Sequence, residues 1–245
     1  MSVPRVTTGI PKLDEALGGG FPEGNIVLVA GQAGAGKSLF GMQFLFKNAL
    51  KKIPGAYFTF EEPPEDLKIE GGEIGLDFGK TENLDFVKLT PFDYNDVISK
   101  LTKELDKRKI KVAVLDNITT LASFSESYTS TVTKELDLKD EEKITGKAAI
   151  KAMLYDLAAV FKQRGVTVLW LSELPNKVVY YSRDTESEFI ADGIILMTRL
   201  TAVKNFMRTL SVEKMRKTKH ALNRFPIEIT PNGLVLKPVD DAVSR

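Results

Sequence analysis

Short apolar runs alternate with longer segments of helical periodicity along most of this chain. The apolar runs predict buried strands at residues 25–30, 55–60, 84–89, 112–116 and 166–171. Apolar residues spaced three and four apart predict helices over residues 7–17, 39–46, 96–108 and 148–164. Strands that alternate with helices in this way are typical of an α/β domain with a mostly parallel central sheet flanked by helices.

The end of the chain predicts short strands rather than further helices. These strands are residues 193–197, 209–215, 226–230 and 233–236. Two earlier segments, residues 123–146 and 174–189, show neither helical nor strand periodicity. We predict a mobile insertion for the first and a flexible loop for the second, because loops longer than about 15 residues are usually functional or disordered. Residues 1–245 are then a single domain, since this length suits one α/β core.

Residues 31–38 read Gly-Gln-Ala-Gly-Ala-Gly-Lys-Ser and lie between a predicted strand and a predicted helix. In that context the pattern is a P-loop. Its glycines allow successive backbone N–H groups to turn around a phosphate at a helix N-terminus. We expect Lys37 to reach the outer phosphates and the Ser38 hydroxyl to bind Mg²⁺. The predicted nucleotide-binding residues are Gly31, Gln32, Ala33, Gly34, Ala35, Gly36, Lys37, Ser38 and Leu39.

Acidic residues stand at the ends of three predicted strands. Glu61 and Glu62 follow one strand, Asp116 ends another, and Ser172 and Glu173 follow a third. Because ligands bind beyond the carboxyl ends of parallel strands, one glutamate is positioned to activate a water, and Asp116 to hold Mg²⁺ as a Walker B aspartate. The glutamates are equally consistent with a cap on the helix that follows them, and Asp116 with the start of a turn.

Composition excludes several classes of function. The chain has no cysteine and one histidine, His220, which excludes disulfides and argues against a zinc site built by the protein. The hydrophobic content is 43% without a long apolar run, and we expect no membrane insertion, no secretory signal and a cytoplasmic location. A net charge of +1 gives no global electrostatic reason to expect nucleic acid.

Charge is nevertheless uneven along the chain. From Arg199 to Arg224 there are eight lysines or arginines and a single acid. This asymmetry indicates either a contact surface or a solvated edge strand that lysines protect from aggregation. In the loop before it, Tyr180 and Tyr181 beside Arg183 either stack on single-stranded bases or pack on their own domain.

In this combination the motifs resemble those of the KaiC-like ATPases of the RecA superfamily over nearly the whole chain. The resemblance rests on residues 8–15, 18–20, 58–62, 115–119 and 214–220, which occur in the family's order. It implies a RecA-like P-loop NTPase fold and a homo-oligomeric, hexameric ring with Mg-ATP between neighbouring subunits. It also implies that the glutamate pair serves hydrolysis and that Lys214 and Arg216 reach across the interface. Residues two apart on a strand share a face, so both can aim at the γ-phosphate.

The chain departs from the family in three places. It has one such domain where the clock protein has two in tandem, so clock function is not expected. Glu188 and Phe189 precede Asp192 where the family's phosphorylating domain carries a Ser-Thr pair, so autokinase activity is not expected. The insertion at residues 123–146 is longer than the family would lead us to expect.

We therefore expect an ATP hydrolase that uses ATP and Mg²⁺ and is slow without a partner. The expected catalytic residues are Glu61, Glu62, Lys214 and Arg216, and the expected metal ligands are Ser38 and Asp116. Two alternatives stay open. One is a single-stranded DNA-binding module in DNA repair that uses ATP as an assembly switch, and the other is a regulatory ATPase that acts through protein partners.

Overall fold

The computed structural model describes residues 3–90, 94–122, 125, 128–130, 146–175, 181–201, 206–220 and 224–238. Over these residues the chain forms one nine-stranded sheet in the order β11-β10-β9-β8-β3-β7-β6-β4-β5. Its strands are β3 (Ile26–Gly31), β4 (Gly55–Thr59), β5 (Leu84–Lys88), β6 (Val112–Asp116), β7 (Thr167–Glu173), β8 (Gly193–Thr201), β9 (Phe206–Met215), β10 (Arg224–Thr230) and β11 (Gly233–Leu236). A small separate pair joins β1 (Arg5–Val6) to β2 (Phe21–Pro22).

The nine-stranded sheet has a parallel part and an antiparallel part. Strands β8, β3, β7, β6, β4 and β5 run parallel, while β9, β10 and β11 extend the sheet antiparallel. This confirms the predicted fold class. β8 and β9 are longer than predicted because they pair with each other along their whole length. β9 also pairs with β10, so it is an interior strand, and the edge-strand interpretation of this basic segment was wrong.

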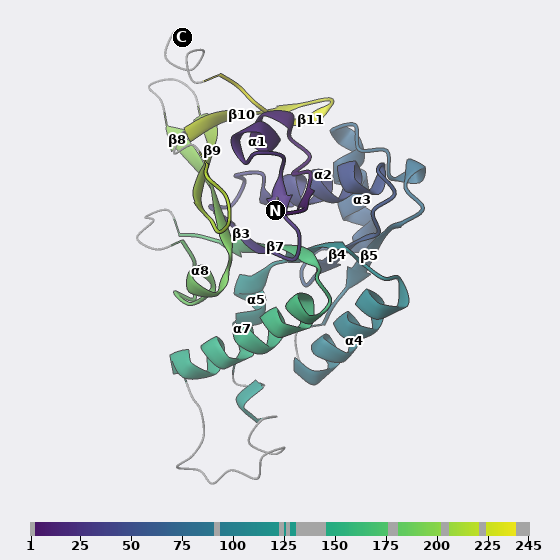
Figure 1. The fold of residues 1–245 in the computed structure, drawn as a ribbon, viewed down its shortest axis with the longest axis vertical. Coiled ribbons are helices and arrows are strands. Elements are labelled where there is room, and N and C mark those ends of the chain that lie inside the picture. The colour runs from purple at the N-terminus through teal and green to yellow at the C-terminus, as the bar shows by residue number, and fades with distance from the viewer. Residues whose placement is uncertain are drawn as a thin grey trace.

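Helices cover both faces of the sheet (Figure 1). On one face lie α1 (Pro11–Ala16), α2 (Lys37–Ala49), α3 (Pro64–Glu73) and the 3-10 turn η1 (Phe78–Lys80). On the other lie α4 (Tyr94–Lys107), α5 (Ile118–Ala122) and α7 (Gly146–Gln163), and α8 (Ser187–Ile190) leads into β8. Each predicted helix is present, but α1 begins at Pro11 rather than at residue 7, whereas the ends of the others differ from the prediction by three residues or fewer. Among the described residues, no helix combines the length and apolar character needed to cross a membrane.

The central strands are buried on both faces because helices pack against each. In β3, Val27 belongs to the apolar cluster under α2, and the next residue, Leu28, belongs to the cluster under α7. Trp170 of β7 is fully buried in the cluster under α7. Leu157 and Phe161 of α7 are also fully buried. Burial on both faces explains why these strands read as continuous apolar runs.

Most of the predicted insertion, residues 123–146, lies outside the described residues. Where it is described, Tyr128 is buried with its ring centroid 4.8 Å from that of Tyr94, and its hydroxyl donates to Asp156 at 2.8 Å. This part of the segment therefore packs on α4 and α7. In the second predicted loop, residues 176–180 lie outside the described part of the chain, and α8 begins near the end of that loop.

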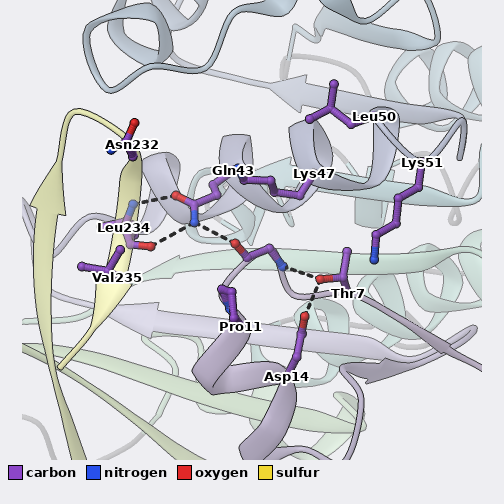
Figure 2. Close-up of a pocket in the computed structure, with 11 residues that line it drawn as sticks. Thr7, Pro11, Asp14, Gln43, Lys47, Leu50, Lys51, Asn232, Leu234 and Val235 are labelled. Atoms are coloured by element: carbon purple, nitrogen blue, oxygen red, sulfur yellow. Dashed lines mark hydrogen bonds between the residues drawn. The ribbon is translucent and has the colours of Figure 1, made fainter. Parts of the chain in front are cut away.

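A buried amide ties the N-terminal segment to α2 and β11. Gln43 Nε2 donates to Gly9 O at 2.8 Å and to Leu234 O at 3.0 Å, while its Oε1 accepts from Leu234 N at 2.6 Å (Figure 2). Gln43 also lines a cavity of about 440 Å³ whose other walls come from the segment around α1 and from β11. These bonds hold α2, the helix that begins at the P-loop, against the antiparallel end of the sheet.

Candidate functional site

The predicted P-loop joins the end of β3 to the start of α2. Gly34 and Gly36 have φ angles of +72° and +98°, in the left-handed region that favours glycine, and α2 begins at Lys37 directly after them. Gly31 is required for a different reason, since a Cβ there would lie 2.3 Å from the carbonyl oxygen of Met197 on β8. The segment thus combines a tight glycine turn with a helix N-terminus, which is the geometry that binds phosphate.

Lys37 folds back over this loop. Its Nζ donates to Gly31 O at 2.9 Å and to Gln32 O at 3.1 Å. Burial lowers the pKa of Lys37, while the carboxylates of Glu173 and Asp116 act in the opposite direction. The ammonium is therefore a partly desolvated cation beside acids, and phosphate oxygens can replace the two carbonyls as its partners.

β6 brings Asp116 to the same edge of the sheet, where two hydroxyls reach one of its oxygens. Ser38 Oγ donates to Asp116 Oδ2 at 2.9 Å, and the Tyr57 hydroxyl donates to the same atom at 2.5 Å. Burial raises the pKa of Asp116, and these two hydrogen bonds oppose that rise. The two predicted metal ligands, Ser38 and Asp116, therefore lie side by side.

This donor set fits Mg²⁺. In the described ranges no three His, Cys, Asp or Glu side chains gather as a metal cage. Mg²⁺ does not need one, because it takes one or two protein oxygens, keeps several waters and uses phosphate oxygens of the nucleotide. A serine hydroxyl and a carboxylate beside a phosphate-binding loop are the ligands that this mode of binding requires.

The two glutamates after β4 have different partners. Glu61 Oε1 accepts hydrogen bonds from Asn117 Nδ2, at 2.9 Å, and from Thr120 Oγ1. Both donors lie on the segment after β6, so this side chain is held toward β6 rather than along the first turn of α3. The pKa of Glu62 is raised, chiefly by burial and then by the nearby Glu70 carboxylate.

These groups share one small polar cavity of about 190 Å³. It is lined by Ala33, Lys37, Ser38, Thr59, Glu61, Glu62, Asp116, Asn117 and Glu173. Strands β3, β4, β6 and β7 all end there, as expected for a ligand site at the carboxyl edge of a parallel sheet. Glu173 is held through its backbone, whose N–H donates to Thr119 Oγ1 at 3.0 Å.

Two arginines beside the P-loop were missed at the level of sequence. Arg208 Nε donates to Gly34 O at 3.0 Å, and Arg199 Nη1 donates to Ala33 O at 3.4 Å. The Arg199 N–H also donates to Gln32 Oε1 at 3.0 Å. The two arginines are cross-strand partners on β8 and β9. The only signal in the sequence was the general excess of basic residues, which does not reveal that this pair reaches the P-loop.

Lys214 and Arg216 lie together near the amino end of β3, away from the carboxyl ends where the P-loop lies. Lys214 Nζ donates to Glu188 O at 3.0 Å and to Ala191 O at 2.7 Å, which ties β9 to α8. Arg216 lies one residue beyond β9, and its Nη1 is 3.4 Å from Asp192 Oδ1. The prediction that both residues lie on one strand was therefore wrong for Arg216. Neither is brought to the P-loop of its own chain.

Tyr181 packs on its own domain. Its hydroxyl donates to Glu213 Oε2 at 3.0 Å, and its backbone N–H donates to Glu188 Oε2 at 2.6 Å. Of the two interpretations of this tyrosine, the structure supports packing over base stacking. Tyr180 lies outside the described residues.

Comparison with known proteins supplies independent findings. The family model for KaiC-type ATPases matches residues 6–241. A UPF0273 protein of Thermotoga maritima is 31% identical over 99% of this chain and 100% of its own length. The clock protein KaiC3 of Synechocystis is 27% identical over 97% of this chain, which spans only 46% of that relative. A solved KaiC-like protein of Pyrococcus horikoshii is 33% identical and superposes with a TM-score of 0.80. The superposition covers 96% of this chain and 100% of that protein.

Proposed function

The chain belongs to the KaiC-like ATPases of the RecA superfamily, and on that premise we propose that it is a Mg-dependent ATP hydrolase that works as a homo-oligomer. One observation carries this proposal. The P-loop lysine, the Ser38–Asp116 pair and both glutamates line a single cavity at the carboxyl edge of the sheet. Phosphoryl transfer asks a protein mainly for positioning and neutralisation of charge, and these groups supply both.

The binding roles follow from position. Residues 31–39 hold the phosphates through backbone N–H groups at the start of α2, and Lys37 moves from the loop carbonyls to the outer phosphates. Ser38 and Asp116 would hold Mg²⁺, and the ion would supply positive charge to offset the charge of the phosphates.

Glu61 is the better placed of the two glutamates to orient the attacking water. Its Oε1 is fixed by Asn117 and Thr120, while its other oxygen takes part in neither bond. A carboxylate held in this way can accept a proton from water without first reorganising. Glu62 lines the same cavity, so single substitutions are needed to separate their roles.

Arg216 is proposed to act on the ATP of a neighbouring subunit. It lies beside Asp192, whose Oδ2 also accepts from the N–H of Ile26 at the start of β3. The P-loop begins at the other end of β3, and the steps between its six residues, at about 3.3 Å each, make a span of about 17 Å. An arginine that cannot reach its own site, and whose side chain is 55% exposed, is available to a partner in a head-to-tail ring. Lys214 supports it by fixing α8 in place.

Mass measurement with and without Mg-ATP, combined with a phosphate-release assay, tests the proposal. Wild type should bind ATP, assemble into a ring with a hexamer as the expected size, and hydrolyse slowly, while Lys37→Ala should neither bind nor hydrolyse ATP. Failure of the wild-type protein to bind ATP would contradict the proposal. An oligonucleotide in the same measurement tests the DNA-binding alternative, whose affinity would fall steeply with salt.

A further inference from the structure

Tyr57 places a buried hydroxyl beside the Walker B carboxylate. The residue is fully buried on β4, and its hydroxyl donates to Asp116 Oδ2 at 2.5 Å. Ser38 Oγ donates to the same oxygen at 2.9 Å, whereas Asp116 Oδ1 takes part in neither of these bonds. In sequence Tyr57 is one more member of an apolar strand and carries no sign of a polar role.

The sheet register holds this hydroxyl where it is. Tyr57 pairs with Val114 on β6, and Asp116 lies two residues further along the same face of that strand. A long aromatic side chain reaches such a diagonal neighbour. The Tyr57 ring stacks on Phe86 of β5, with centroids 5.5 Å apart and planes 17° from parallel. On the α2 side, a Cβ at Gly41 would lie 3.5 Å from the ring.

The two hydroxyls on Asp116 differ in what they do when metal binds. Ser38 is itself a proposed Mg²⁺ ligand, so its oxygen would bind the ion as well as donate to the carboxylate. Tyr57 is enclosed by β5, β6 and α2, so its hydroxyl continues to donate to Asp116 Oδ2. A carboxylate held by one oxygen keeps its orientation, and ligand orientation by such hydrogen bonds is a major determinant of metal affinity.

We propose that Tyr57 is a positioning residue for Mg²⁺, because its hydroxyl holds Oδ2 of Asp116 and thereby orients the carboxylate toward the ion. This inference rests on the proposed function, in which Asp116 is a metal ligand. It predicts that loss of a single buried oxygen atom weakens metal binding without weakening contacts to the nucleotide itself.

Tyr57→Phe removes only that hydroxyl, and Tyr94→Phe is a matched control. Tyr94 is also buried, but it lies on the other face of the sheet, where its hydroxyl donates to Met153 O at 3.1 Å. Mn²⁺ affinity is measured by electron paramagnetic resonance in complex with a non-hydrolysable ATP analogue. Analogue affinity and thermal unfolding, both in EDTA, check the fold and the nucleotide site.

Tyr57→Phe should weaken Mn²⁺ binding about tenfold, the usual effect of removing an outer-shell partner, and leave analogue affinity in EDTA unchanged. Tyr94→Phe should leave both affinities unchanged. Wild-type Mn²⁺ affinity in Tyr57→Phe would overturn the inference, and so would an equal loss in Tyr94→Phe.

Asp116→Asn completes a double-mutant cycle. In that background Tyr57→Phe should have no further effect on Mn²⁺ affinity, because its only route to the metal has gone. A persistent tenfold effect would show that Tyr57 acts elsewhere and would overturn the inference while leaving the proposed function standing. If Asp116→Asn alone kept wild-type Mn²⁺ affinity, the metal site of the proposed function would fail instead.

Discussion

Arg216→Ala should bind Mg-ATP normally and lose most hydrolysis, because we propose that Arg216 acts on the ATP of the next subunit. The expected loss is about a thousandfold, the lower end of what an arginine finger contributes. Lys219→Ala removes an exposed cation from the same segment and serves as the control, with little expected loss. Arg216 is separated from its own P-loop by about 17 Å along β3, and this distance is the reason to expect action across an interface rather than within its own chain.

Mixing two inactive variants distinguishes action across an interface from action within a chain. Subunits with Arg216→Ala retain Lys37, and subunits with Lys37→Ala retain Arg216. In an equal random mixture, about a quarter of head-to-tail interfaces pair an intact P-loop with an intact arginine, so about a quarter of the wild-type rate should return. Energy transfer between labelled subunits verifies exchange. If exchange is demonstrated and the rate stays at the level of the parents, Arg216 does not act in trans.

Three further predictions test the rest of the site. Lys37→Ala should lose ATP affinity in calorimetry while its melting temperature stays at the wild-type value, because the ammonium contacts loop carbonyls and not the core; tight ATP binding would contradict its role. Glu61→Gln should keep Mg-ATP binding and lower turnover about a hundredfold or more. Glu62→Gln should lower turnover less. A larger loss in Glu62→Gln would assign the role of the base to Glu62. Gly31→Ala places a Cβ against a β8 carbonyl and should lower the free energy of unfolding by about 1–3 kcal/mol in urea titrations. Gly72→Ala is the matched control, because a Cβ at Gly72 on α3 meets no atom within 4 Å, and it should not lower the free energy of unfolding. Equal urea midpoints for the two variants would contradict the packing argument.

The parts of the site that are continuous in sequence were predictable. The P-loop is one segment between a strand and a helix, and Asp116 and the glutamates each stand at the end of an apolar run. Since carboxyl ends of parallel strands meet at one edge, their convergence follows from topology. Ser38 and Asp116 are the strongest case, because the expected metal pair is joined by a hydrogen bond in the structure.

The basic segment from Arg199 to Arg224 shows what could not be predicted from the sequence. Its charges form one cluster in sequence, but β9 runs antiparallel to β8 and carries the chain from the carboxyl ends of the parallel strands to their amino ends. Arg199 and Arg208 therefore contact the P-loop, while Lys214 and Arg216 lie at the amino end of β3. The composition of the segment gives the number of its charges. Only the direction of the strands shows that these charges belong to two separate places in the structure.

The sequence by itself determined the central strands, the longer helices and the position of the P-loop motif, because hydrophobic periodicity and contiguous motifs are local properties. Only the tertiary structure decided that the Tyr57 hydroxyl bonds Asp116 and that Asn117 holds Glu61. Both contacts cross from β4 to β6, strands far apart in the chain, and both depend on register. A slip of one residue would turn each side chain to the opposite face, and a continuous apolar run gives no sign of which face a residue occupies.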